Sequence, residues 1–264
     1  EEEYNEARKT YISEYNLLHL AAKKGNPNII KILLKQPDID VNALFISQRN
    51  EKIIKTALSI AIENDNIEAI RILLLNPKIR TDIKIFDAKY KYYYLYIKEE
   101  ATPLYKAVQK RNKEIVRLLL SKPETDVNEP CKYSHRRFDL FIREITQIKN
   151  APLDVAVENE DTEIIELLLT RENINVNILS EYKYNCTIID GDKESYEEII
   201  KNTSPLFVAV EKENQKIVEN LLLRSNINLN LISTIKKDNN ITKKTSIELA
   251  REKGNEKILN LLEN

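Results

Sequence analysis

The chain has 264 residues, of which 31% are charged, and its formal net charge is −1. This balance offers no basic field for a phosphate backbone or an anionic lipid surface, which argues against nucleic acid and membranes as main partners. No apolar run reaches the length of a transmembrane helix, and no basic-then-apolar signal peptide opens the chain.

Cysteine usage indicates the compartment. Only Cys131 and Cys186 are present, too few for a disulfide scaffold. A reducing compartment fits this count, so we expect a cytoplasmic location, with the nucleus as the alternative. The sequence also contains no methionine, which favours a piece of a longer protein.

The first segment, residues 1–15, is acidic at its start and then mixed in charge. Tyr4, Ala7, Tyr11 and Tyr15 recur at roughly helical spacing. We expect a helix here, either as a cap over the following unit or as the remnant of an earlier one.

From residue 16 onward one sequence unit recurs six times. An apolar anchor is followed after three residues by alanine and after fifteen by leucine, as at Leu104, Ala107 and Leu119. The repeat cores are predicted at about residues 16–42, 56–82, 102–128, 151–177, 204–230 and 245–264.

Each core reads as two short antiparallel helices. Eight residues after the anchor stands a residue whose side chain can cap a helix start. An apolar stripe at helical spacing follows it, as in Ile115, Val116 and Leu119. The expected caps are Asn26, Asn66, Asn112, Asp161, Asn214 and Asn255.

The unit resembles the ankyrin repeat over nearly all of the chain from about Asn16 onward. The family pattern T-P-L-H-x-A-A, E-I-V-x-L-L-L and D-V-N is matched at Thr102–Leu104, Ala107, Glu114–Val116, Leu118–Leu120 and Asp126–Asn128. The resemblance implies an all-α repeat solenoid of ankyrin-type stacked helix pairs, with long β-hairpin fingers inserted between the repeats.

Two departures from the family pattern are informative. The turn glycine survives only as Gly25 and Gly254, so we expect adjusted turn geometry at Asp65, Arg111, Glu160 and Glu213. From the anchor to the closing Asn or Asp the distance is constant, whereas the connector to the next anchor varies between 16 and 29 residues. Every insertion therefore falls at one topological place.

Three connectors show hairpin patterns. They are residues 42–56 with a turn at 48–51, residues 83–98, and residues 229–245 with a turn at 238–240. In the fourth connector we expect a strand over 181–189, a tight turn at Asp190-Gly191 and a short helical turn over 194–201.

The connector at residues 83–98 is the richest in tyrosine. Strand alternation predicts one face that carries Tyr90, Tyr92, Tyr94 and Tyr96. This face either packs against adjacent hairpins or is a docking surface, since tyrosine is frequent among interface hot spots.

The third connector offers further contact residues and weak signs of chemistry. Arg136, Arg137, Phe138 and Phe141 are candidate anchors for an acidic partner segment. Cys131 lies four residues before His135, yet a structural zinc site needs four ligands and a nucleophile–base pair needs a third, orienting group. We therefore predict no metal, no cofactor and no catalytic residues.

The resemblance implies a second surface, the groove lined by the exposed ends of the first helices. Its residues carry mixed charges and indicate no single ligand charge. They are Lys23, Lys24, Glu63, Asn64, Gln109, Lys110, Glu158, Asn159, Glu211 and Lys212.

The sequence thus predicts a non-enzymatic scaffold or adaptor that binds a protein or peptide through the groove and the hairpins. The alternative is a regulatory or targeting domain of a larger enzyme whose catalytic part lies outside this chain. We expect a monomer, with self-association through an exposed hairpin edge as the alternative.

Overall fold

The computed structural model describes residues 16–47, 52–92, 94–190 and 193–263. The chain divides into two compact units, with the boundary after Asp126. The helix expected in residues 1–15 lies outside the described residues. None of the helices in the described part of the chain has the length and apolarity needed to span a bilayer.

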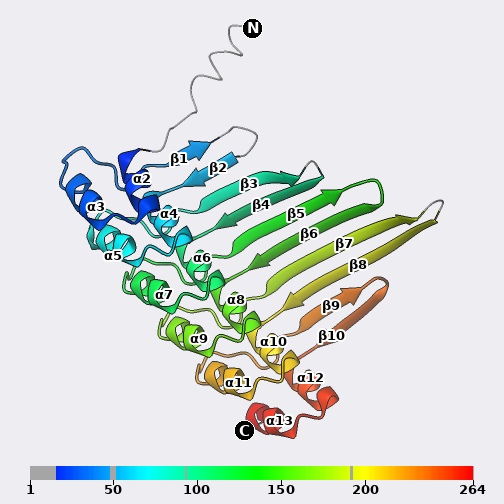
Figure 1. The fold of residues 1–264 in the computed structure, drawn as a ribbon. Coiled ribbons are helices and arrows are strands. Elements are labelled where there is room, and N and C mark those ends of the chain that lie inside the picture. Colours follow the sequence, from blue (N-terminus) through cyan, green and yellow to red (C-terminus); the bar gives the residue numbers. More distant parts are fainter. Residues whose placement is uncertain (1–15, 48–51, 93, 191–192, 264) are drawn as a thin grey trace. The chain divides into compact units, whose positions relative to one another are not determined.

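The first unit alternates helix pairs with β-hairpins (Figure 1). Its inner helices pack on one another, as do its outer helices. The elements are α2 (Leu17–Lys24), α3 (Pro27–Leu33), β1 (Phe45–Ser47), β2 (Lys52–Lys55), α4 (Ala57–Glu63), α5 (Ile67–Leu75), β3 (Ile85–Tyr92), β4 (Leu95–Ala101), α6 (Pro103–Gln109) and α7 (Lys113–Leu120).

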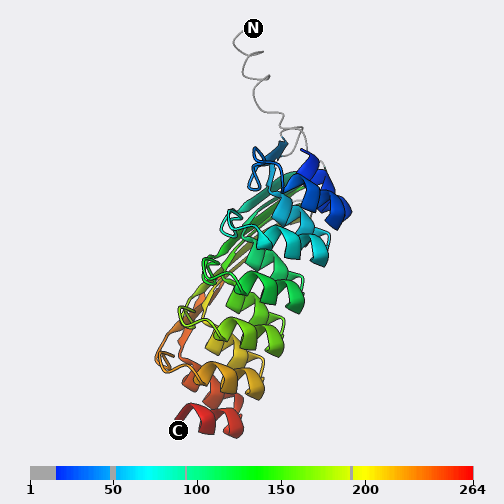
Figure 2. The same ribbon diagram turned by 90° about the vertical axis from the view of Figure 1, so that its left-hand side faces the viewer.

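The second unit continues the same alternation with longer hairpins, and Figure 2 shows its helix pairs stacked in sequence order. Its elements are β5 (Cys131–Phe138), β6 (Ile142–Asn150), α8 (Pro152–Glu158), α9 (Thr162–Leu169), β7 (Ser180–Asp190), β8 (Lys193–Thr203), α10 (Pro205–Glu211), α11 (Gln215–Leu222), β9 (Ser233–Lys237), β10 (Asn240–Lys244), α12 (Ser246–Lys253) and α13 (Glu256–Glu263).

The predicted fold class, an all-α solenoid, is wrong. Helices hold 39% of the residues and strands hold 28%. The hairpins are not separate insertions, because neighbouring hairpins pair edge to edge as β2 with β3, β6 with β7 and β8 with β9, all antiparallel. Each pairing satisfies backbone N–H and C=O groups that an isolated hairpin edge would leave open. The result is an antiparallel sheet in each unit.

The three predicted hairpins are confirmed by β1–β2, β3–β4 and β9–β10. The turn expected at 48–51 lies outside the described residues. The helical turn expected over residues 194–201 is wrong, since these residues belong to β8 and pair with β7 along its whole length. Long-range pairing with β7 has overridden the weak local preference of this segment.

The anchor positions form the core of each unit. Leu18, Leu58, Leu104, Leu153 and Leu206 are buried. Side chains of Asn26, Asn112, Asp161, Asn214 and Asn255 cap the outer helices as predicted.

Asn66 is the exception among the predicted caps. Its side-chain amide does not cap α5 but donates to the carbonyl oxygen of Ala22 at 2.8 Å. This side chain therefore joins the first two repeats.

The turns between paired helices keep a left-handed backbone with or without glycine. Asp65, Arg111, Glu160 and Glu213 have φ between 52° and 58°, close to the 65° of Gly25. The expected adjustment of these turns is therefore wrong. Packing of the helix pair imposes the conformation, although it costs an ordinary L-residue roughly 1 kcal/mol or more.

Asparagines that close the repeats link successive loops. The Asn42 amide donates to the carbonyl of Lys78 at 2.7 Å and accepts from the N–H of Arg80 at 2.9 Å. The same pair of bonds joins Asn128 to residues 173 and 175, and Asn177 to residues 226 and 228. Each asparagine fixes the spacing between two repeats.

The two turn glycines provide a matched stability test. A Cβ on Gly25 would lie 2.7 Å from the Asn66 side chain, whereas a Cβ on Gly254 meets nothing within 4 Å. Gly254→Ala should lower the free energy of unfolding by about 1–2 kcal/mol, because alanine is strained at this positive φ. Gly25→Ala should lower it by about 1–3 kcal/mol more, because its Cβ also clashes with Asn66. Urea unfolding of both variants measures this difference. Equal losses of unfolding free energy would show that the Asn66 side chain moves away from the new Cβ at no cost.

The asparagine links give a second test. Asn177→Ala removes two hydrogen bonds and should lower the free energy of unfolding by about 1–3 kcal/mol. Asn230→Ala is the control, because Asn230 closes the last such loop and its side chain makes no hydrogen bond with the described residues. If both variants lose the same stability in urea unfolding, the links do not carry the effect.

Candidate functional site

One face of the second-unit sheet carries a band of aromatic side chains. Residues directly opposite one another in antiparallel strands point to the same face. Two such rows cross β5, β6, β7 and β8, and they consist of Tyr133, Ile148, Tyr182 and Lys201, and of His135, Thr146, Tyr184 and Ile199. We call this surface the tyrosine face.

The tyrosine face lies toward the helices. Ile148, Tyr182, Ile199 and Lys201 share a hollow of about 400 Å³ with side chains of α8 and α10. The remaining lining residues are Asn150, Asp154, Glu158, Ser180, Glu181, Thr203 and Val208. We call this space the Asp154 hollow.

Asp154 lies in the hollow at the third residue of α8, next to a helix start that lacks a capping side chain. Thr56, Thr102, Ser204 and Thr245 cap four of the other inner helices with a hydroxyl and Asn16 caps α2 with its amide oxygen, whereas Ala151 occupies this position before α8. The Ala151 N–H instead donates to Asp154 Oδ2 at 2.8 Å. This contact fixes the carboxyl group under the strands.

The Asp154 carboxyl is only partly satisfied. Its side chain is buried, and neither Asp154 Oδ1 nor Ser180 Oγ has a well-formed hydrogen bond with the described residues. Burial raises the pKa of Asp154 to about 7, opposed by the Ala151 N–H and the nearby Ser180 hydroxyl and aided by Glu158. The group therefore exchanges its proton near neutral pH.

Tyr182 and Tyr184 remain neutral phenols. Burial, with the charges of Glu144 and Glu197, raises the pKa of Tyr182. A hydrogen bond with Cys186, followed by burial, raises the pKa of Tyr184. Beside them His135 Nε2 lies 3.0 Å from Glu144 Oε1. The face thus combines large aromatic area with fixed polar groups.

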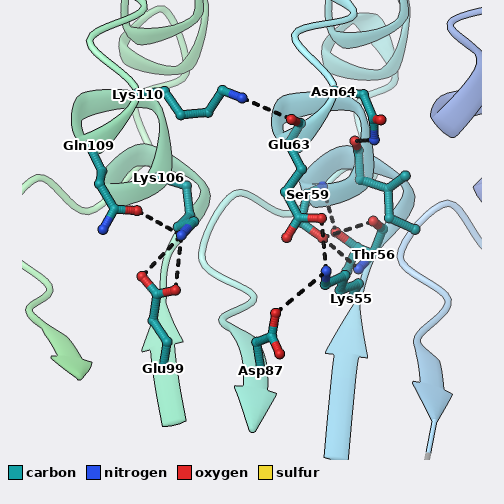
Figure 3. Close-up of polar contacts among 11 residues, drawn as sticks. Lys55, Thr56, Ser59, Glu63, Asn64, Asp87, Glu99, Lys106, Gln109 and Lys110 are labelled. Carbon is teal, nitrogen blue, oxygen red and sulfur yellow. Dashed lines mark hydrogen bonds and ion pairs between the residues drawn. The ribbon is translucent and has the colours of Figure 1, made fainter. Parts of the chain in front are cut away.

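The corresponding surface of the first unit is occupied by its own ion pairs (Figure 3). Lys55 Nζ lies 2.8 Å from Glu63 Oε2 and 3.9 Å from Asp87 Oδ2. Lys106 Nζ lies 3.0 Å from both carboxylate oxygens of Glu99. Charges there satisfy one another between strand and helix.

Groove residues predicted from the sequence lie at the ends of the inner helices, and several have partners within the chain. Lys110 Nζ donates to the Glu63 carbonyl at 2.8 Å, and Gln109 Oε1 accepts from Lys106 at 2.7 Å. Asn64 donates to the Ile60 carbonyl, and Lys212 lies 3.4 Å from Glu158. Lys23 and Lys24 end α2, Asn159 follows α8, and Glu211 ends α10. Their binding role stays a prediction.

The predicted four-tyrosine face does not follow simple alternation. Tyr90 is opposite Tyr96, but the register shifts before Tyr92, which is opposite Leu95, and Tyr94 lies in the turn. Glu99 faces α6, where it contacts Lys106 (Figure 3). Tyr96 is three residues before Glu99 in β4, so strand alternation places it on the opposite side. The docking role of these tyrosines remains a prediction.

The second predicted set is only partly brought together. Arg136 and Phe138 are exposed on the side opposite the tyrosine face, and Phe141 is exposed at the end of the hairpin. Arg137 forms an ion pair of 2.8 Å with Asp139. The separation follows from strand alternation, which places neighbouring residues on opposite faces.

Tyr133, Tyr182, Tyr184 and Asp154 were not predicted as site residues. Tyr182 and Tyr184 are two residues apart in a segment correctly predicted as a strand, which indicates a shared face. The sequence holds no comparable signal for Asp154, because its partners in the hollow come from four other elements.

Comparison with known proteins gives a family. The model for ankyrin repeats (3 copies) matches residues 3–87 and 86–180, which together exceed half of the chain. A search of the curated proteins found no match.

Asp154→Asn tests the buried carboxyl. Its pKa is raised from the usual 3.8 to about 7, so the stability it contributes is complete below 3.8 and is lost as the pH rises through 7. Asn retains an acceptor for Ala151, so the variant should be more stable than the wild type at pH 8, by about 1–3 kcal/mol, and not at pH 4.

Thermal unfolding at both pH values measures this difference. Glu248→Gln is the control at the equivalent helix position, where hydrogen bonds from Thr245 lower the pKa of Glu248. This variant should lose stability at pH 8. An Asp154→Asn variant less stable than the wild type at pH 8 would contradict the assignment.

Proposed function

The chain belongs to the ankyrin repeat family, whose repeats are generally protein–protein interaction modules, and we propose that it is a non-enzymatic module that binds an extended segment of a partner protein. The tyrosine face is the observation that carries this proposal. Ankyrin repeats are typically non-catalytic, which supports the assignment as a binding protein.

Physical properties of the tyrosine face suit a peptide. Tyr133, Tyr182 and Tyr184 offer large amphipathic surfaces with few rotatable bonds, so ordering them on binding costs little entropy. All three are partly accessible to solvent. Strands form one wall and α8 and α10 the other, as the shared lining of the Asp154 hollow shows. A single extended chain fits between walls of this kind.

Further properties support a protein partner and an intracellular setting. The net charge of −1 provides little attraction for nucleic acid or anionic membranes. Cys131 and Cys186 are buried thiols, which supports a cytoplasmic or nuclear location. The same surface serves a regulatory or targeting domain of a larger enzyme equally well, and we propose a monomer as the binding form.

A selection from a random peptide library tests the proposal. We expect the chain to enrich peptides that share a motif and to bind them in calorimetry. Tyr182→Ser combined with Tyr184→Ser should weaken binding by roughly thirtyfold to a thousandfold, since hot-spot residues each contribute about 2 kcal/mol or more and their contributions are not strictly additive.

Tyr196→Ser combined with Phe138→Ser is the matched control. Both residues are more than half exposed, and their registers place them on the other side of the sheet. These changes should leave peptide affinity unaltered. Loss of binding in this variant, with retention in the Tyr182 and Tyr184 variant, would refute the tyrosine face as the binding surface.

A further inference from the structure

We propose that the Asp154 hollow receives the side chain of an arginine from the bound partner. The inference rests on the proposed function, because it takes the arginine to belong to the peptide on the tyrosine face. It adds a chemical requirement that aromatic contacts alone do not impose.

The polar end of the hollow leaves one oxygen of the Asp154 carboxyl without a well-formed hydrogen bond. Asp154 is more than nine-tenths buried, yet its Oδ1 has no hydrogen-bond partner in the described part of the chain. The buried Ser180 hydroxyl lies beside this carboxyl and makes only a poorly formed hydrogen bond with it. A buried acceptor left in this state is costly unless a ligand supplies a donor. A guanidinium group presents several N–H donors in one plane and matches a carboxylate with a second oxygen beside it.

The apolar part of the hollow suits the remainder of an arginine. Ile148, Ile199 and Val208 line it together with the ring of Tyr182. Long cationic side chains bury their methylene stems against surfaces of this kind and extend only the charged head. At about 400 Å³ the hollow has room for one such side chain.

Charge around the hollow favours a cation. Glu158 lines it with Asp154, against a single ammonium from Lys201 among the described residues. Glu158 lies 3.4 Å from Lys212, so this lysine partly neutralises the outer carboxylate. No lysine or arginine of the described chain pairs with Asp154 in these contacts, which leaves its charge for the ligand.

Binding should depend on pH. The charged groups of the described chain that face Asp154 in the hollow are Glu158 on its own helix and Lys201 on β8. The raised pKa of Tyr182 keeps that phenol neutral. Since Asp154 has a pKa of about 7, arginine affinity should fall up to tenfold for each pH unit below 7.

The test uses the whole chain and small probes in NMR titrations. We expect N-acetyl-arginine amide to shift the signals of Asp154, Ser180 and Tyr182 and to lower the pKa of the Asp154 carboxyl. The citrulline analogue, which has the same shape without the charge, should bind at least tenfold more weakly. Asp154→Asn should remove the preference for arginine, and Glu248→Gln should leave it intact.

A Lys201 variant should change arginine affinity in the direction opposite to Asp154→Asn. Among the described residues Lys201 is the cation that lines the hollow, so Lys201→Gln should tighten arginine binding. Weaker arginine binding in this variant, together with a preference of the wild type for N-acetyl-aspartate amide, would identify a site for acidic side chains and overturn the inference. Equal shifts from the arginine and citrulline probes, or an unchanged Asp154 pKa, would also overturn it.

Failure of this inference is separable from failure of the proposed function. If selected peptides bind the Asp154→Asn variant as tightly as the wild type and still require Tyr182 and Tyr184, the arginine site is refuted and the peptide surface stands. If no peptide is selected although N-acetyl-arginine amide binds as described, the hollow is an arginine site and the proposed function fails.

Discussion

Edge-to-edge hydrogen bonding between successive hairpins is the interaction on which the arrangement of the rest depends. Where β6 pairs with β7, eight residues of one strand are opposite eight of the other, from Ile142 with Ile188 to Lys149 with Glu181. This register aligns side chains from different repeats into rows. Without it, Tyr133 and Tyr182 would belong to unrelated loops and would form no common surface.

The two units show how the same backbone plan carries different chemistry. In the first unit the helix-facing side of the strands holds Asp87 and Glu99, which pair with Lys55 and Lys106. In the second unit the equivalent side carries tyrosines and a hollow. The same side of the strands is thus occupied by ion pairs in the first unit and presents aromatic side chains in the second.

One position of the inner helices illustrates how local variation produces the hollow. The third residue of these helices is His19, Ser59, Tyr105, Asp154, Phe207 or Glu248. His19, Ser59 and Glu248 accept a hydrogen bond from the residue before the helix, as Asp154 does. Only Asp154 is a carboxylate that is also buried beneath strands, because Ala151 supplies no cap of its own and Glu248 remains exposed.

The sequence by itself determined the repeat, its helix pairs and most of its caps. Leu104 and its equivalents recur with alanine three residues later. Contacts between residues so close in sequence can be predicted from the spacing alone. The hairpins with a clear alternation, such as β9–β10, were predictable for the same reason.

Tertiary structure alone decided the pairing between hairpins, the strand over 194–201 and the left-handed turns at Arg111, Glu160 and Glu213. It also decided the Asp154 hollow, whose lining comes from β6, α8, β7, β8 and α10. Backbone hydrogen bonds between strands do not depend on which side chains the strands carry, so the sequence does not reveal them. Packing can also impose a conformation that a residue does not prefer. The sequence therefore shows which segments can pair, while the register that brings their side chains together is set by the stacked repeats.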